Sequence, residues 1–251
     1  MLDDGPASGH PLLTDLVVSV TEVGPHGHHW LAPGNHGTQV ASRVLLPHLA
    51  DELRNHSAIT AAGTVHVARV LEPAPDRPDE TRFAGSDAGL PPHEVVQRAI
   101  TEVHTNHGVR VFNLSFGLGE AFNSVHVSEL TEVIDDLARD LDIIVVVPTG
   151  NAPLFGHSET ASGHHAQRDY PAYLSEPEHR LADPGPAALA LTVGAVAHSD
   201  APVARPHSAR LRDTAIAGID QLSPVSRTGP GIGASVARVN KPDLVADGGN
   251  F

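Results

Sequence analysis

The sequence contains no cysteine among its 251 residues. Disulfides, catalysis by a thiol and zinc sites built on cysteine are therefore excluded for these residues. Cysteine usage leaves the redox compartment undetermined.

Basic residues are scarce, since 16 lysines and arginines stand against 30 aspartates and glutamates and give a formal net charge of -14. Nucleic-acid surfaces depend on lysine and arginine to displace counterions from phosphates. The charge balance therefore argues against a nucleic-acid partner and favours a peptide or a small molecule.

Long apolar runs are also missing. No run approaches the roughly 20 residues of a membrane span, and residues 1–30 lack the pattern of a signal peptide. We therefore expect no membrane association, and the location stays undetermined from the sequence, with the cytoplasm favoured. The chain is 40% hydrophobic, enough for a full core. No linker or repeat divides it, so we expect one domain over residues 1–251.

Short apolar runs rich in β-branched residues predict four buried strands. They occupy residues 64–71, 109–117, 142–151 and 188–197.

Two amphipathic patterns between these runs predict helices. The first begins at Pro91 and Pro92, and the second has Ser128 placed to cap its first turn. Their apolar residues recur at helical spacing, as Val96, Ala99, Ile100 and Val103 in the first and Leu130, Val133, Ile134, Leu137, Ala138 and Leu141 in the second. Buried strands separated by such helices indicate an α/β fold, a doubly wound parallel sheet with helices on both faces.

Two segments contain many loop-forming residues. Residues 73–92 are rich in proline and acidic side chains and predict a surface loop, and residues 152–187 are also loop-rich. In doubly wound sheets, ligands bind beyond the carboxyl ends of the strands. Functional residues are therefore expected in the loops that follow each strand.

Seven short motifs follow one another along the chain. They are MLDDG, NHGTQVAS, NLSFG, VVVPTGN, LTVGAV, SPVSRTGPG and KPDLVADGG. In this order and spacing they resemble the subtilisin-like serine peptidases, the subtilases, over residues 2–249. The resemblance implies the subtilisin-like fold and hydrolysis of peptide bonds by an Asp-His-Ser triad.

By this resemblance Asp3 orients the histidine and His36 is the general base. The pair is needed because a serine hydroxyl is a weak nucleophile until an imidazole takes its proton. Gly37 would let the backbone approach closely, since a side chain there would crowd the substrate. The helical pattern after it predicts a buried stripe of Ala41, Val44, Leu45 and His48.

The resemblance also assigns residues that bind the substrate. Asn151 would stabilise the oxyanion through its side-chain amide, and Gly150 before it would contact the substrate. An extended peptide would pair with the segment of Asn113, Ser115, Phe116 and Gly117.

The family pattern continues beyond what this sequence contains. The nucleophilic serine of the family lies in a Gly-Thr-Ser-x-Ala-x-Pro element after the Lys-Pro-Asp motif, and the sequence ends at Phe251 before such an element. We therefore expect a fragment that lacks the nucleophile and the first core strand and is inactive alone. Ser235, in GASVA, precedes that motif, and Pro242 would break a helix begun there, so we do not expect it to be the nucleophile.

Three functions remain open from the sequence. The first is a serine endopeptidase domain whose serine lies outside the chain, and the second is a dead pseudo-peptidase that binds extended peptides. The third is a receiver-like signalling domain with Asp3 and Asp4 as magnesium ligands and Lys241 as switch lysine, although such a domain needs only about half this length.

No cofactor is expected. Structural calcium is common among subtilases, but the loops here do not support it. Histidines at 26, 28 and 29, and the pair His164 and His165, could ligate a metal such as zinc but lack a well-placed carboxylate. The stretch GHPLL at residues 9–13 is similar to bacterial intracellular members, some of which act with an ATPase partner.

Overall fold

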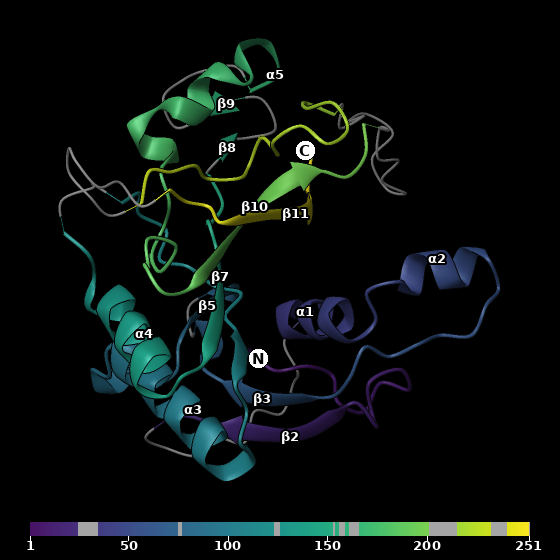
Figure 1. The fold of residues 1–251 in the computed structure, drawn as a ribbon, viewed down its shortest axis with the longest axis vertical. Coiled ribbons are helices and arrows are strands. Elements are labelled where there is room, and N and C mark those ends of the chain that lie inside the picture. Colours follow the sequence, from purple (N-terminus) through teal and green to yellow (C-terminus); the bar gives the residue numbers. More distant parts are fainter. Residues whose placement is uncertain are drawn as a thin grey trace. The chain divides into compact units, whose positions relative to one another are not determined.

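The computed structural model describes residues 1–24, 35–74, 77–122, 126–152, 154–155, 159–160, 166–200, 215–231 and 240–250. It contains two compact units, one of Met1–Ser115 with Leu141–Ile143 and one of Phe116–Asp140 with Ile144–Phe251. Both combine helices with parallel strands (Figure 1), so the predicted α/β class is confirmed. The single domain over residues 1–251 stays a prediction.

The first unit is built around strand β3 (Val65–Arg69). Strands β1 (Leu2–Asp3) and β2 (Val17–Glu22) pair with it in parallel, one on each side. A parallel bridge joins Leu2 to Leu114, just after strand β6 (Val111–Asn113). Asp3 therefore stands at the carboxyl end of a short strand that has partners on both sides.

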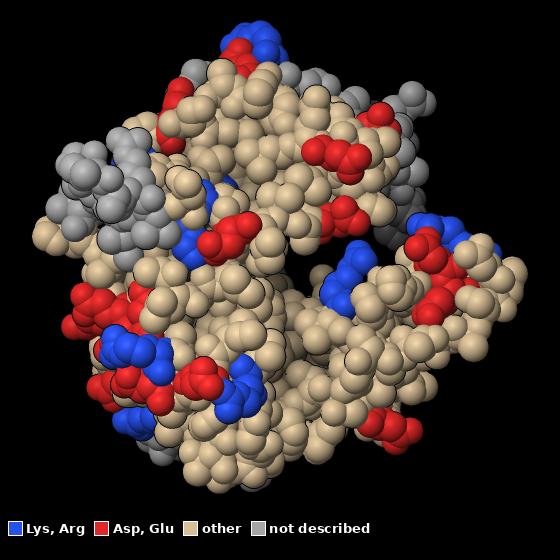
Figure 2. All heavy atoms as spheres, viewed as in Figure 1, with Lys and Arg blue, Asp and Glu red and all other residues tan. Residues whose placement is uncertain are grey.

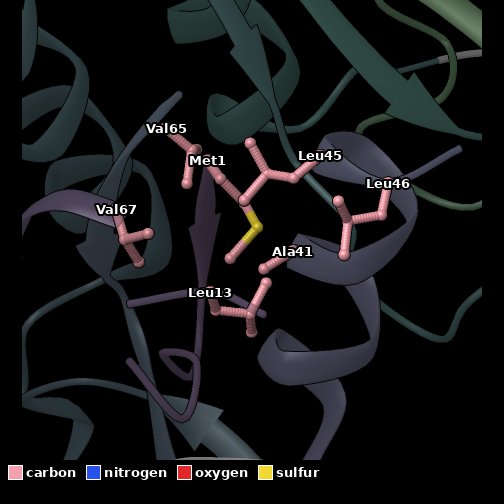
Figure 3. Packing of buried hydrophobic residues seen from close by; sticks show 7 residues of the cluster. All are labelled: Met1, Leu13, Ala41, Leu45, Leu46, Val65 and Val67. Carbon is pink, nitrogen blue, oxygen red and sulfur yellow. The ribbon is translucent and has the colours of Figure 1, made fainter. Parts of the chain in front are cut away.

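Helices cover both faces of β3. Helix α1 (Asn35–Leu45) packs on the face of Val65 and Val67, in the cluster of Met1, Leu13, Ala41, Leu45, Leu46, Val65 and Val67 (Figure 3). On the other face the ring of His66 stacks on His107 of helix α3 (Pro92–His107), with ring centroids 4.2 Å apart. Successive residues of a strand point to opposite faces, so the predicted double cover is confirmed for this strand.

Helix α3 follows the sequence prediction closely. Pro91 precedes its first turn and Gly108, with φ of 66°, ends it. Its buried residues are Val95, Val96, Ala99, Ile100 and Val103.

The predicted stripe of α1 is partly wrong. Ala41 and Leu45 are buried as expected, but Val44 is 42% exposed and His48 lies beyond the helix. The helix ends because Pro47 cannot continue its hydrogen bonds. A short helix, α2 (Leu49–Arg54), follows.

A hairpin and a 3-10 turn were not predicted in this unit. Strands β4 (Leu71–Ala74) and β5 (Arg77–Phe83) form an antiparallel hairpin that extends into residues 73–92, the segment expected to be loop. Arg82 lies opposite Glu72 and pairs with it at 2.6 Å. A 3-10 turn, Ser86–Ala88, follows the hairpin.

Strand β2 was not predicted. It is the outer strand of its three-stranded sheet, and Val18 and Val20 are exposed while Ser19 bonds to His66 at 2.8 Å. Val17 packs against the core cluster, but Val18 and Val20 do not mark a buried face.

The second unit holds three parallel strands in the order β11, β10, β7. These are β7 (Ile144–Pro148), β10 (Leu191–Ala197) and β11 (Leu244–Gly248). The first two confirm predicted strands, whereas β11 was not predicted. Helix α4 (Glu129–Asp140) is also confirmed, and the Ser128 hydroxyl accepts a hydrogen bond from the Thr131 amide at 3.2 Å, as a cap does.

The long connection in this unit is loop-rich, as predicted, but holds several short elements. They are β8 (Leu154–Phe155), β9 (Glu159–Thr160), α5 (Ala166–Asp169) and the 3-10 turns Ala172–Ser175 and Pro177–His179.

Charged side chains of both signs lie near one another on the face drawn in Figure 2. Exposed pairs in the described residues include Arg139 with Asp136 at 2.7 Å and Arg98 with Glu94 at 3.0 Å. Such pairs add little to stability. None of the helices in the described ranges combines the length and apolar character that crossing a bilayer requires.

Candidate active site

Asp3 and His36 are joined by a hydrogen bond in the first unit. The distance from Asp3 Oδ1 to His36 Nδ1 is 2.8 Å. The Asp3 side chain is 0% exposed, whereas that of His36 is 51% exposed. A buried carboxylate thus holds an imidazole that still reaches solvent.

The end of β1 fixes the carboxylate. Asp3 Oδ1 also accepts a hydrogen bond from the Asp4 amide at 2.8 Å. The chain then turns at Gly5, where φ is +90° and a Cβ would collide with the Arg69 side chain. The glycine of the DDG motif is required here by both conformation and space.

A second set of hydrogen bonds joins the two motifs. The Gly37 amide donates to Asp4 Oδ1 at 2.6 Å, and the Ala7 amide donates to Thr38 Oγ1 at 2.9 Å. A Cβ on Gly37 would stand 2.5 Å from Asp4 Oδ1 and 2.9 Å from the Gly5 backbone. The close approach expected at Gly37 is therefore present, but it is made to Asp4 and Gly5 of the chain itself, and crowding of the substrate by a side chain there stays a prediction.

The two acidic side chains change the proton affinity of the histidine. The hydrogen bond that the imidazole donates to Asp3 raises the pKa of His36, and the charges of Asp3 and Asp4 add to that rise against the opposing effect of burial. Burial raises the pKa of Asp4, although its bond from the Gly37 amide opposes the rise. Protonated His36 is therefore stabilised by this site.

An open pocket of about 350 Å³ lies beside His36. Its wall is formed by α1 and the end of β6, with His36, Gln39, Val40, Arg43, Val44, Asn113 and Ser115 lining it. Asn113 Nδ2 donates to Ser115 Oγ at 2.7 Å. Two of the residues expected to bind substrate thus share a pocket with the expected base, and the exposed Val44 faces it.

Gly150 and Asn151 follow β7 in the second unit. Gly150 has φ of +86°, and a Cβ there would stand 2.6 Å from Ala182 Cβ. Asn151 is exposed, and its side-chain amide makes no hydrogen bond to any residue that the structure describes. Its backbone is held by an antiparallel bridge to Ser226.

Phe116 and Gly117 also belong to the second unit. Phe116 is 9% exposed. A Cβ on Gly117 would stand 3.0 Å from the Asp183 carbonyl oxygen, and the next amide, that of Leu118, donates to the same oxygen at 2.8 Å.

One group of described side chains could hold a metal ion. The ligand atoms of Asp3, Asp4 and His36 lie within 4.8 Å of one another. Two of these ligand groups, Asp3 and His36, are already joined by a hydrogen bond between Oδ1 and Nδ1. The histidines at 26, 28 and 29, the pair at 164 and 165, and Ser235 lie outside the described residues.

One residue of the site, Asp4, had no role in the triad that the sequence predicts. Its carboxylate accepts a hydrogen bond from the amide of Gly37. The second aspartate of the DDG motif was the available signal. Lys241, the switch lysine of the receiver-like alternative, donates to the Ala190 carbonyl and to Asp243, both at 2.6 Å, within the second unit.

Comparisons with known proteins agree with the motifs. The family model of the subtilase family, peptidase S8, matches residues 1–251. The uncharacterized protein y4bN of Sinorhizobium fredii (strain NBRC 101917 / NGR234) is 33% identical over 157 residues, which are 62% of this chain and 35% of that protein. The chain thus aligns with about a third of that relative's length.

Two solved structures are similar to the chain. The prenylagaramide maturation protease PagA is 16% identical, with 85% of this chain and 56% of that chain covered and a TM-score of 0.45. The patellamide maturation protease PatA is 16% identical, with 91% and 60% covered and a TM-score of 0.46. The family model matches the whole chain, and this match overturns the receiver-like alternative. This protein belongs to the subtilase family.

Proposed function

We propose that this chain is part of a serine endopeptidase in which Asp3 and His36 activate a serine that lies outside residues 1–251. The observation that carries the proposal is the 2.8 Å hydrogen bond between buried Asp3 and half-exposed His36. Membership of the subtilase family supports it.

In this proposal each ring nitrogen of His36 has its own role. Nδ1 faces a carboxylate oxygen, so Nδ1 carries the proton and donates it to that bond. Nε2 then has the free lone pair and takes the proton of the serine hydroxyl as the hydroxyl attacks the peptide carbonyl carbon. Asp3 stabilises the imidazolium that results, which later gives its proton to the leaving amine.

The substrate in this proposal is an extended peptide. The pocket beside His36, with Asn113 and Ser115 in its wall, would receive part of that peptide. Asn151, which is exposed, would donate through its side-chain amide to the oxyanion of the tetrahedral intermediate. An ATPase partner stays a prediction.

Hydrolysis of casein by the natural full-length protein tests the proposal. We expect cleavage that falls by at least about 1,000-fold in His36→Ala, because the serine then loses its base. His48→Ala, which removes an exposed histidine beyond the same helix, is the matched control and should retain activity. Binding of casein without cleavage by the wild type would instead support the pseudo-peptidase.

A further inference from the structure

Arg227 is buried behind the segment that carries Asn151. It is 3% exposed, and its guanidinium donates to four backbone carbonyl oxygens of the second unit. The acceptors are Asn151 at 3.0 Å from Nε, Glu178 at 3.0 Å and Arg180 at 2.9 Å from Nη1, and Gly119 at 2.7 Å from Nη2. One side chain thus ties together three stretches of loop.

The backbone on both sides of Asn151 is hydrogen-bonded to one segment, residues 225–227. The Ala152 amide donates to the Val225 carbonyl at 2.7 Å, and the Arg227 amide donates to the Gly150 carbonyl at 3.3 Å. A Cβ on Gly150 would stand 3.2 Å from Arg227 Cδ, so the stem of the arginine lies directly against Gly150. The position of Asn151 therefore depends on Arg227 through both its stem and its guanidinium.

The acceptor at Gly119 belongs to another part of the proposed site. It follows Phe116 and Gly117, the residues expected to bind the substrate backbone. The same guanidinium therefore contacts the carbonyl of the expected oxyanion donor and a carbonyl two residues past the expected substrate segment.

The chemistry of this site requires arginine. Arginine presents its N–H groups in a planar fork, whereas the donors of lysine radiate from one nitrogen and cannot reach acceptors spread around such a plane. Burial lowers the pKa of Arg227, and the hydrogen bonds to carbonyl dipoles are what stabilise its charge.

We propose that Arg227 is a positioning residue for catalysis, which fixes the backbone of Asn151 so that its side-chain amide meets the oxyanion. This inference rests on the proposed function. The residue touches no reacting atom and acts only through Asn151 and the loop of Gly119.

A double-mutant cycle in the natural full-length protein tests this role. The variants are Arg227→Gln, Asn151→Ala and their combination, with kcat measured per titrated active site on an internally quenched peptide. Asn151→Ala should lower kcat by roughly 100 to 1,000-fold, and Arg227→Gln by about 10-fold or more. Because both act on one donor, the double variant should lie within about 3-fold of Asn151→Ala.

Two further variants separate positioning from stability. Arg139→Gln, the same change at an exposed arginine of the second unit, should leave kcat unchanged. Arg227→Lys keeps the charge but loses the fork, and should lower kcat nearly as much as Arg227→Gln. Multiplied losses in the double variant would show that Arg227 does not act through Asn151, and a wild-type kcat in Arg227→Lys would show that the planar fork is not needed; either result would overturn the proposal.

Hydrogen exchange gives a readout that needs no activity. In Arg227→Gln the amides of Leu118 and Ala152 should exchange at least about 10-fold faster, while those of α3 stay unchanged. Unchanged exchange at both amides would overturn the proposal. A wild type without peptidase activity but with the expected exchange would count against the proposed function and still support the placement of Asn151 by Arg227.

Discussion

The backbone amide of Gly37 donates to Asp4 Oδ1 at 2.6 Å, one residue away on each chain segment from the bond between Asp3 and His36. Two consecutive aspartates thus bind two consecutive residues of α1. Asp3 holds the imidazole and Asp4 holds the backbone on which the imidazole stands.

Replacing Asp3 by Asn should abolish most turnover. Asparagine would present either an oxygen or an amide to Nδ1, and the imidazolium would lose the buried charge that stabilises it. Since the same replacement of the triad aspartate in another serine peptidase lowers kcat by about 10,000-fold, we expect kcat to fall on the order of 1,000 to 10,000-fold. Steady-state kinetics measure the loss, with circular dichroism to verify folding. A fall of less than 10-fold would contradict the role of Asp3.

The pH dependence of activity should follow His36. Only neutral imidazole can accept a proton, so activity rises with pH through the pKa of His36, which Asp3 and Asp4 raise above its ordinary value of about 6.5. Asp4→Asn removes one of the two raising charges but keeps an oxygen for the Gly37 amide. The acid limb of kcat/KM should therefore move to lower pH in that variant, and a shift to higher pH would count against this electrostatic account.

Gly37→Ala should destabilise the fold despite the better helix propensity of alanine. The propensity gain is about 1 kcal/mol, but the new methyl would press on the Gly5 backbone, and overpacking costs roughly 1 to 3 kcal/mol. The lower free energy of unfolding should come with reduced kcat, because His36 must move. Gly63→Ala is the control, since nothing lies within 4 Å of its Cβ. Equal stability of the two variants would refute the close approach at Gly37.

Leu45 and Val44 should respond differently to truncation. Leu45 is 1% exposed in the core cluster, so Leu45→Ala should cost about 2 to 5 kcal/mol of unfolding free energy. Val44→Ala should cost less than about 1 kcal/mol, because its side chain faces the pocket and solvent. Denaturant unfolding measures both. A larger loss in Val44→Ala would restore the helix face expected from the sequence.

Sequence periodicity was informative where one face of an element is buried. Helix α3 and α4 were predicted because their apolar residues recur at helical spacing, and β7 and β10 because they are short apolar runs. Strand β2 was not predicted because Val18 and Val20 are exposed and the polar Ser19 bonds to His66. Alternation of polarity could not identify such a strand.

The candidate site was predicted from motif order, and not from local pattern. Asp3 and His36 lie 33 positions apart in sequence, and no periodicity links them. Arg227 stood within a quoted motif without a role, because its function depends on four carbonyls that the fold brings around it. Every residue type carries a backbone carbonyl, so the acceptors of Arg227 could not be recognised from the sequence.

The most direct test of the central claim is labelling of the natural full-length protein by a fluorophosphonate probe, followed by mapping of the labelled peptide. The account predicts a label on one serine outside residues 1–251, formed at least about 1,000-fold more slowly in His36→Ala. Label on Ser235, lost in Ser235→Ala, or labelling that is indifferent to His36, would contradict the claim that Asp3 and His36 activate a serine outside this chain.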